Sequence, residues 1–443
     1  MSYAFIFRLY LKFINTPFYA GYDVHGTRWE QLAIGCWGET YCMDIDMALT
    51  KRTITDMRML MTKGENNVKW RWSDAGWGGD WATFLVDGIR LLPFQWKCAY
   101  VSHGPCLTDV IYTGWYGEDR NVYMSANVNT MRTDDYCRTI SRIKYSFRSD
   151  VLAGDGASLF QLGSAGYICT PTVAWGNVDG LIEERNLEDI SSGVYLSKQK
   201  MEGNGPWWFG FPGQKQLNDR KWGKGWRALI IRKFEGKFGD EHYSNPSFSL
   251  FNNKRGDKQA NVTFMLQTPE SITSFSEEDW VSFEIEIATF PHNATDYYGP
   301  NKAFTQHLEA NPSSWSTVHR EAIGNNLSVQ IHSCDTLVSN YPIVIATVAG
   351  FGNVSFSIRG GVGAVPIKFT GLCSRNFALY QKLDNDVVQS LNQGTDENDS
   401  WQSDFVYEHK CVEDLEGAYC LSFNIQLDGN QESEWVLKAV PQS

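Results

Sequence analysis

Short runs in which apolar and polar residues alternate recur along the whole chain. In residues 281–287 every second residue is Val, Phe or Ile, and the residues between them are Ser282, Glu284 and Glu286. Similar runs occupy residues 143–147 and 421–427. Alternation with a period of two places the apolar side chains on one face of a strand and the polar side chains on the other. The pattern therefore predicts half-buried strands of antiparallel sheets.

Helical periodicity is scarce. It is confined to a predicted excursion at residues 300–322, which follows Gly299-Pro300 and contains two short segments, 301–310 and 315–322. Many short strands with little helix predict an all-β protein that consists of two large antiparallel β-sandwich or jelly-roll domains.

The predicted domain boundary lies near residue 200, where the charged and weakly patterned stretch 180–200 is followed by glycine and proline. We expect an N-terminal β-sandwich at 1–200, which carries a glycan cleft, and a C-terminal β-sandwich or jelly roll at 201–443. There are two alternatives. Either a further domain seam lies near 293–326, or one wide sandwich spans the boundary.

One segment holds four tryptophans within twelve residues, together with two aspartates and three glycines. Glycine weakens a strand, so this segment is predicted to be a loop, and loops commonly carry function. Flat rings offer apolar faces to a pyranose, and carboxylates accept hydrogen bonds from its hydroxyls. The segment predicts a sugar-binding cleft, with burial of the rings in a sandwich core as the alternative. The predicted sugar-binding residues of this segment are Trp70, Trp72, Trp77, Asp80 and Trp81.

A second aromatic segment lies between Gly205-Pro206 and Pro212-Gly213, and these flanking residues predict a loop. It contains Trp207 and Trp208, which are predicted either to form a second wall of the sugar site or to pack into the core.

A charged segment just before the strand at 142–147 contains Arg132, Asp134, Asp135 and Tyr136. Glycoside hydrolysis needs two carboxyl groups. Adjacent aspartates on a strand point to opposite faces, so at most one of Asp134 and Asp135 is predicted to be catalytic. A charged surface turn is the alternative. The candidate partner carboxylates are Glu39, Asp74 and Asp80.

His103 suggests a different chemistry. A polysaccharide lyase needs a base that removes a proton next to a uronate carboxyl, and a cation that neutralises this carboxyl. His103 or His25 as the base, with Tyr136 and Arg132, would supply these groups. The alternative is a structural histidine.

Charge and hydropathy argue against several partners. The net charge is −12 and no long Lys/Arg run occurs, so we expect no nucleic-acid partner. No apolar run approaches about 18 residues, so we expect no membrane span. No cofactor is expected. Asp44 and Asp46, and the acidic stretch 396–399, offer oxygen ligands for calcium, with a solvated acidic turn as the alternative. Homo-oligomer formation is left open.

The compartment is also left open. Residues 1–13 alternate like a strand, and no cleavage site for a signal peptide follows them. Ten cysteines and five Asn-x-Ser/Thr sequons keep a secreted origin open. The alternatives are a secreted or periplasmic protein whose leader has been removed and a cytoplasmic protein.

The large all-β pattern with Trp-rich segments resembles sandwich-type glycoside hydrolases and polysaccharide lyases as a class. The function predicted from the sequence is cleavage of glycosidic bonds in a polysaccharide or oligosaccharide, with hydrolysis favoured. The alternatives are a lyase that acts on a uronate-containing glycan by β-elimination, a non-catalytic glycan-binding protein, and a capsid-like structural jelly roll.

Overall fold

The computed structural model describes most of the chain between residues 18 and 440. The described ranges are 18–24, 27–36, 39–46, 53–62, 70–72, 77–79, 84–91, 93–103, 107–117, 119–131, 137–154, 156–164, 172–186, 195–212, 225–252, 262–291, 294, 302–312, 314–348, 353–373, 377–382, 388–390, 403–407, 409–410, 419–429 and 431–440.

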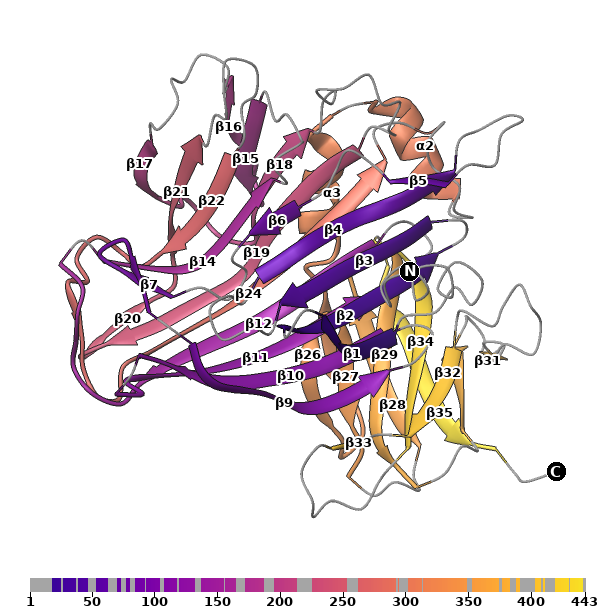
Figure 1. The fold of residues 1–443 in the computed structure, drawn as a ribbon. Coiled ribbons are helices and arrows are strands. Elements are labelled where there is room, and N and C mark those ends of the chain that lie inside the picture. The colour runs from indigo at the N-terminus through magenta and orange to yellow at the C-terminus, as the bar shows by residue number, and fades with distance from the viewer. Residues whose placement is uncertain are drawn as a thin grey trace.

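Two large antiparallel sheets dominate the fold (Figure 1). The first sheet has the strand order β1 (Phe18–Val24), β2 (Thr27–Cys36), β3 (Glu39–Asp46), β4 (Thr53–Thr62), β6 (Trp77–Gly79), β14 (Ala157–Ser164), β22 (Val262–Gln267), β21 (Ser247–Asn252), β17 (Tyr195–Lys200). Three short strands extend it: β5 (Trp70–Trp72) pairs with β4, β7 (Leu85–Val86) pairs with β14, and β8 (Ile89–Arg90) pairs with β7.

The second sheet has the strand order β16 (Gly180–Asn186), β15 (Thr172–Asn177), β18 (Trp207–Pro212), β19 (Gly225–Phe238), β24 (Trp280–Pro291), β12 (Cys137–Phe147), β11 (Val122–Met131), β10 (Leu107–Tyr116), β9 (Pro93–His103), β33 (His409–Lys410), and β20 (Glu241–Tyr243) pairs with β19. A separate two-stranded antiparallel sheet joins β13 (Val151–Leu152) to β23 (Ser274–Phe275).

The two large sheets pack face to face around one apolar core. Along β24 the odd-numbered residues from Val281 to Ile287 lie in this core, as the alternation in the sequence requires. The rings of Phe160 in the first sheet and Phe283 in the second meet edge to face, with their centroids 6.3 Å apart. The hydroxyl of Tyr145 donates to the main-chain carbonyl of Leu159 across the interface at 3.0 Å. Where side chains are described, the inner faces of the two sheets are therefore closed by this core.

A second sandwich is formed by the C-terminal part of the chain. One sheet has the order β25 (Ser328–Ile331), β28 (Val354–Arg359), β35 (Ser433–Ala439), β30 (Phe377–Lys382), β31 (Val388–Ser390). The other has the order β26 (Thr336–Asn340), β27 (Ile343–Ala346), β29 (Val362–Leu372), β34 (Tyr419–Asp428), β32 (Ser403–Tyr407). Their apolar core also takes in Ile140 of β12, so this C-terminal sandwich packs on the outer face of the second sheet, the face turned away from the first sheet.

Two helices occupy the predicted excursion between the sandwiches, α2 (Lys302–Ala310) and α3 (Ser316–Gly324). Their apolar residues pack on the outer face of the second sheet around Trp208 and Ile230. No helix among the described residues is long and apolar enough to cross a membrane.

The predicted all-β class with sandwiches and little helix is confirmed. Strand pairing runs across residue 200, however. Strand β12 pairs with β24, β14 with β22, and β15 with β18. The N-terminal sandwich thus uses strands from both sides of the predicted boundary and extends to Pro291. The sheets of the C-terminal sandwich begin after the helices, at the seam that the sequence offered as an alternative.

Candidate functional site

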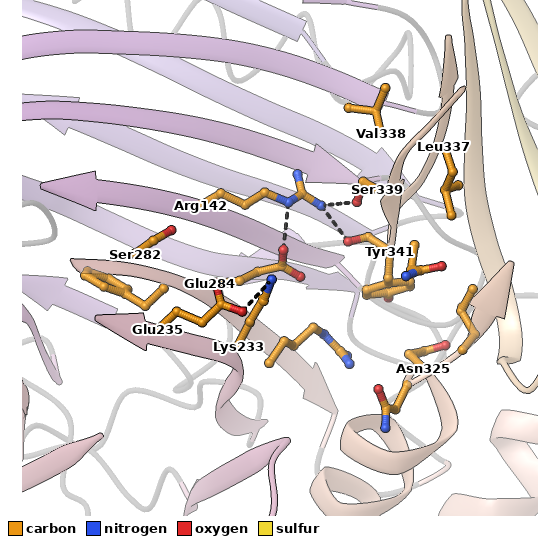
Figure 2. Close-up of a pocket in the computed structure, with 15 residues that line it drawn as sticks. Arg142, Lys233, Glu235, Ser282, Glu284, Asn325, Leu337, Val338, Ser339 and Tyr341 are labelled. Atoms are coloured by element: carbon orange, nitrogen blue, oxygen red, sulfur yellow. Dashed lines mark hydrogen bonds and ion pairs between the residues drawn. The ribbon is translucent and has the colours of Figure 1, made fainter. Parts of the chain in front are cut away.

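A cavity of about 450 Å³ lies where the C-terminal sandwich meets the outer face of the second sheet (Figure 2). We call it the junction pocket. Its floor comes from β12, β19 and β24, and its walls come from the segment after α3 and from the β26 region. Its volume falls within the range of about 300–1,000 Å³ that is usual for ligand pockets. The lining residues used below are Arg142, Lys233, Glu235, Ser282, Glu284, Asn326 and Ser339.

Strand register explains why the floor is polar. The inward residues of β24 fill the core, so Ser282 and Glu284 point outward into the pocket. Glu284 lies opposite Arg142 of β12 on one side and opposite Lys233 of β19 on the other. Three strands that are distant in sequence thereby place a carboxylate between two cations.

Arg142 makes the densest set of contacts in the pocket. Its Nε donates to Oε2 of Glu284 at 2.7 Å, as Figure 2 shows. Its Nη1 donates to the side-chain oxygens of Asn127 and Asn129. Its Nη2 donates to Oγ of Ser339 at 2.7 Å and to the main-chain carbonyl of Tyr341 at 2.6 Å. A guanidinium has five N–H donors, so all of them are engaged. Arg142 therefore positions Glu284 and the 339–341 segment, and it has no donor left for a ligand.

Among the described residues, Glu284 and Glu235 are the two carboxylates that line the pocket. Arg142 donates to Oε2 of Glu284. No side chain in the described ranges bonds the other oxygen, Oε1. Glu235 pairs with Lys233 at 3.0 Å on the more exposed rim. Glu235 lies opposite Ser282, and Ser282 is two residues from Glu284 on the same face. The two glutamates are thus diagonal neighbours on adjacent strands, a relation in which the Cα atoms lie about 7–8 Å apart.

A buried ionic cluster closes the inner end of the pocket. Arg138, Glu286 and Glu321 have fully buried side chains, and Arg232 is 6% exposed. Nη1 of Arg138 lies 3.4 Å from Glu321 and 3.7 Å from Glu286. Nε of Arg232 donates to Glu286 at 2.7 Å. Burial would lower the pKa of Arg232, but the charge of Glu286 and their hydrogen bond outweigh it, and the pKa is raised. The cluster fastens α3 to the second sheet.

Tyr341 lies against this cluster. The guanidinium of Arg232 stacks over its ring, 4.4 Å from the centroid, and Arg138 donates to its hydroxyl. Burial raises the pKa of Tyr341 well above its ordinary value, although the nearby arginines oppose this shift. The hydroxyl is therefore a poor base at neutral pH.

None of the described candidate residues predicted from the sequence lines the junction pocket. In the first sheet, Trp72 of β5 and Trp77 of β6 lie on strands that both pair with β4. Trp70 lies in β5, Glu39 begins β3, and His103 ends β9 in the second sheet. The remaining candidates lie outside the described residues: Asp80, Trp81, Arg132, Asp134, Asp135 and Tyr136. The roles predicted for all these residues, and for calcium, stay predictions. Among the described residues no cluster of three or more His, Cys, Asp or Glu could hold a metal ion.

Trp207 and Trp208 are packed in the interior, as the alternative to a sugar-binding role predicted. Both belong to β18, and they are 4% and 0% exposed. The indole N–H of Trp208 donates to the main-chain carbonyl of Asn177 at 3.1 Å. Its ring stacks on that of Trp315, with the ring centroids 5.8 Å apart. These rings have no open face for a sugar, so they cannot form the second wall of a cleft.

Sequence reasoning did not single out Arg142, Glu235, Glu284 or Tyr341. A signal was present, because the polar face of the strand at 280–291 carries two glutamates and the strand at 137–147 carries two arginines. The alternation identifies these faces, but it does not say that a second sandwich covers them.

Comparison with known proteins gives only weak structural similarity. No family model and no curated protein matches the sequence. The chain is similar to galactose 1-epimerase from Lactobacillus acidophilus, with 8% identity and a TM-score of 0.31 over 62% of this chain and 99% of that one. It is similar to a galactose mutarotase-like protein from Clostridium acetobutylicum, with 6% identity and a TM-score of 0.31 over the same shares of the two chains. It is also similar to heparan sulfate lyase from Pedobacter heparinus, with 8% identity and a TM-score of 0.28 over 75% of this chain and 39% of that one.

Proposed function

We propose that this chain is a carbohydrate-active enzyme that binds a sugar chain in the junction pocket and hydrolyses a glycosidic bond there. The observation that carries the proposal is the diagonal pair Glu235 and Glu284 on the pocket floor. Two carboxyl groups about 6.5–9.5 Å apart are what an inverting glycosidase uses, one to protonate the leaving oxygen and the other to activate water. The Cα atoms of diagonal neighbours lie about 7–8 Å apart, a backbone spacing from which two glutamate side chains can bring their carboxyl groups into this range.

The rest of the lining suits a hydroxyl-rich ligand. Ser282, Ser339 and the amide of Asn326 present hydroxyl and amide groups to the pocket, and these both donate and accept hydrogen bonds. Glu284 offers Oε1 as a further acceptor. A pyranose presents hydroxyls that match such a lining, whereas an apolar ligand would leave these groups without partners.

Every cation in the described lining of the pocket is paired with a carboxylate. Arg142 is paired with Glu284, Arg232 with Glu286, and Lys233 with Glu235. A neutral sugar suits this balance better than a uronate, whose carboxylate needs an uncommitted cation. The raised pKa of Tyr341 also removes the hydroxyl that could act as the base of an elimination. These two features favour hydrolysis over the lyase alternative in this pocket.

The two glutamates are assigned different roles. Arg142 fixes Glu284 in place, so Glu284 is assigned as the base that activates water. Glu235 lies on the more exposed rim, with its side chain 49% exposed, and it is assigned as the acid. The arginine itself contributes position rather than substrate contacts.

The test is an assay for reducing ends on a panel of neutral and uronate-containing polysaccharides. The wild-type chain should release reducing ends without a rise in the ultraviolet absorbance that unsaturated uronates produce. Glu284→Gln and Glu235→Gln should each lower the rate about 100-fold or more. The matched control is Glu434→Gln, because Glu434 pairs with Lys382 at 3.1 Å on the exposed surface of the C-terminal sandwich. This control should keep the wild-type rate.

Three results would contradict hydrolysis in the junction pocket. A rise in ultraviolet absorbance would assign an elimination. Binding without turnover would assign a recognition function. Turnover that survives both glutamate substitutions would move the active site elsewhere, with the tryptophan segment of the first sheet as the next candidate.

A further inference from the structure

Three half-buried aromatic residues form a row across the outer face of the second sheet. Trp115 of β10 lies opposite Tyr123 of β11, and their ring centroids are 4.8 Å apart. Tyr123 lies opposite Ser146 of β12, which in turn lies opposite Trp280 of β24. We call Trp115, Tyr123, Ser146 and Trp280 the aromatic row. It crosses three strand gaps, which correspond to about 14 Å at the usual strand spacing.

The aromatic row faces solvent rather than a core. The neighbouring residues along these strands, such as Tyr116, Val122 and Val281, point inward and are buried in the core between the large sheets. The rings of Trp115, Tyr123 and Trp280 are intermediate in exposure. The ammonium group of Lys144 lies 5.1 Å from the ring centroid of Trp280, at the solvent side of the same face. Large rings at such positions are not needed for packing in the core.

The aromatic row continues directly into the junction pocket. One step along the strands, a polar row runs from Ser125 through Lys144 and Ser282 to Glu235. Two of its members, Ser282 and Glu235, line the pocket. Residues two apart on a strand are separated by about 6.7 Å, so the rings begin one row from the pocket lining. A ligand that leaves the pocket along the sheet meets the indole of Trp280 first.

We propose that the aromatic row forms an additional binding site for the sugar chain whose scissile bond lies in the junction pocket. This inference rests on the proposed function and extends it: the substrate is a chain of several sugar units rather than a monosaccharide or disaccharide. The apolar faces of successive pyranoses stack on the rings of Trp280, Tyr123 and Trp115. Lys144 and Ser125 donate to their hydroxyls.

The small side chain of Ser146 supports this arrangement. Ser146 separates Tyr123 from Trp280, so the floor between the two rings is low and a chain can pass over it. A bulky side chain at this position would obstruct the path without removing a ring. Ser146 therefore provides a second variant that leaves every aromatic residue in place.

The experiment measures binding to immobilised oligosaccharides of two to eight units, both neutral and uronate-containing, with catalytically impaired Glu284→Gln as the parent. In this parent, Trp280→Ala and Trp115→Ala should each weaken binding to long chains about tenfold, which corresponds to the loss of about 1.4 kcal/mol from one stacked ring. Ser146→Arg should weaken it by a similar factor because it obstructs the path between the rings. Binding to disaccharides should change less than twofold. The matched control is Tyr380→Ala, because Lys438 lies 5.7 Å from the Tyr380 ring on the C-terminal sandwich, away from the row.

The outcomes separate this inference from the proposed function. If the parent binds long chains and the three row variants bind them equally well, the additional binding site is rejected while the pocket stands. If neither wild-type chain nor parent binds or cleaves any saccharide, the proposed function fails and this inference fails with it. Sedimentation gives a further check: loss of a wild-type oligomer in Trp115→Ala and Ser146→Arg would make the row a protein interface and overturn the proposal.

Discussion

Nη2 of Arg142 donates to the main-chain carbonyl of Tyr341 at 2.6 Å, across 199 residues of sequence. This bond joins the outer face of the large N-terminal sandwich to the turn that follows β26 in the C-terminal sandwich. The same guanidinium holds Glu284, so the arginine that fixes the contact between the sandwiches also fixes the proposed base. Stability at the junction and catalysis in the pocket should therefore change together.

Arg142→Met should lower both the stability of the protein and the catalytic rate. The substitution leaves Glu284 without its cation and removes all five donated bonds, so we expect a loss of about 2–4 kcal/mol in the free energy of unfolding. Denaturant unfolding measures this loss, and the reducing-end assay should show a parallel loss of rate. The control is Arg185→Met in edge strand β16, whose exposed pair with Glu183 should contribute less than about 1 kcal/mol. Equal effects of the two substitutions would contradict the role given to Arg142.

The sequence is informative about strands and their faces, and less so about what covers each face. The alternation at 281–287 correctly assigns Phe283 to a core and Glu284 to a polar face, because burial on one side of a strand imposes a period of two. The residues that cover this polar face lie near residue 341. Local patterning in the sequence holds no information on which distant segment makes this contact.

The aromatic segment at 207–212 shows a second limit. Glycine and proline near Trp207 and Trp208 predict a loop, yet the segment is an interior strand. Gly210 fits there because the chain is tightly packed around it. A Cβ added at this position would lie 3.3 Å from Cγ2 of Val318 in α3 and 3.4 Å from the ring of Trp226. The glycine thus serves close packing of a helix on a sheet rather than a turn, a choice that depends on tertiary structure.

Trp208→Ala should destabilise the fold without changing sugar recognition. The indole is fully buried, stacks on Trp315 and donates to Asn177, so its removal leaves a large cavity and an unsatisfied carbonyl. We expect a loss of about 3–5 kcal/mol. Thermal unfolding measures the loss, and oligosaccharide binding measured well below the lowered melting temperature should match the wild type. A selective loss of binding in a stable protein would instead support the role that the sequence suggested for this ring.

His307 of α2 should make stability depend on pH in the acid range. Burial, and to a lesser extent the charge of Arg320, lower the pKa of His307 from its ordinary value of 6.5 to about 4. Between these two values the unfolded chain binds the proton and the folded chain does not, so stability falls as the pH drops through this window. His307→Gln, which can still bond Thr317, should remove this part of the pH dependence. Melting temperatures of both proteins between pH 7 and pH 4 test it: a gap between the two curves that stays constant with pH would be inconsistent with a lowered pKa.

The stereochemistry of the product provides the most direct check on the proposed pair of carboxylates. A retaining enzyme needs its carboxyl groups about 5–5.5 Å apart, so that one can attack the sugar, whereas inversion needs room for a water molecule. Glu235 and Glu284 are diagonal neighbours on adjacent strands, and Arg142 holds Glu284 from the side of β24 opposite to Glu235, which favours the wider separation. We therefore expect the first product to have the opposite anomeric configuration to that of the bond cleaved. Proton NMR of a fresh reaction, recorded before the sugar mutarotates, shows which anomer forms. Retention would exclude this pair as acting in the positions observed. Inversion that disappears in Glu284→Gln, and that Glu434→Gln leaves unchanged, would assign the water-activating role to Glu284.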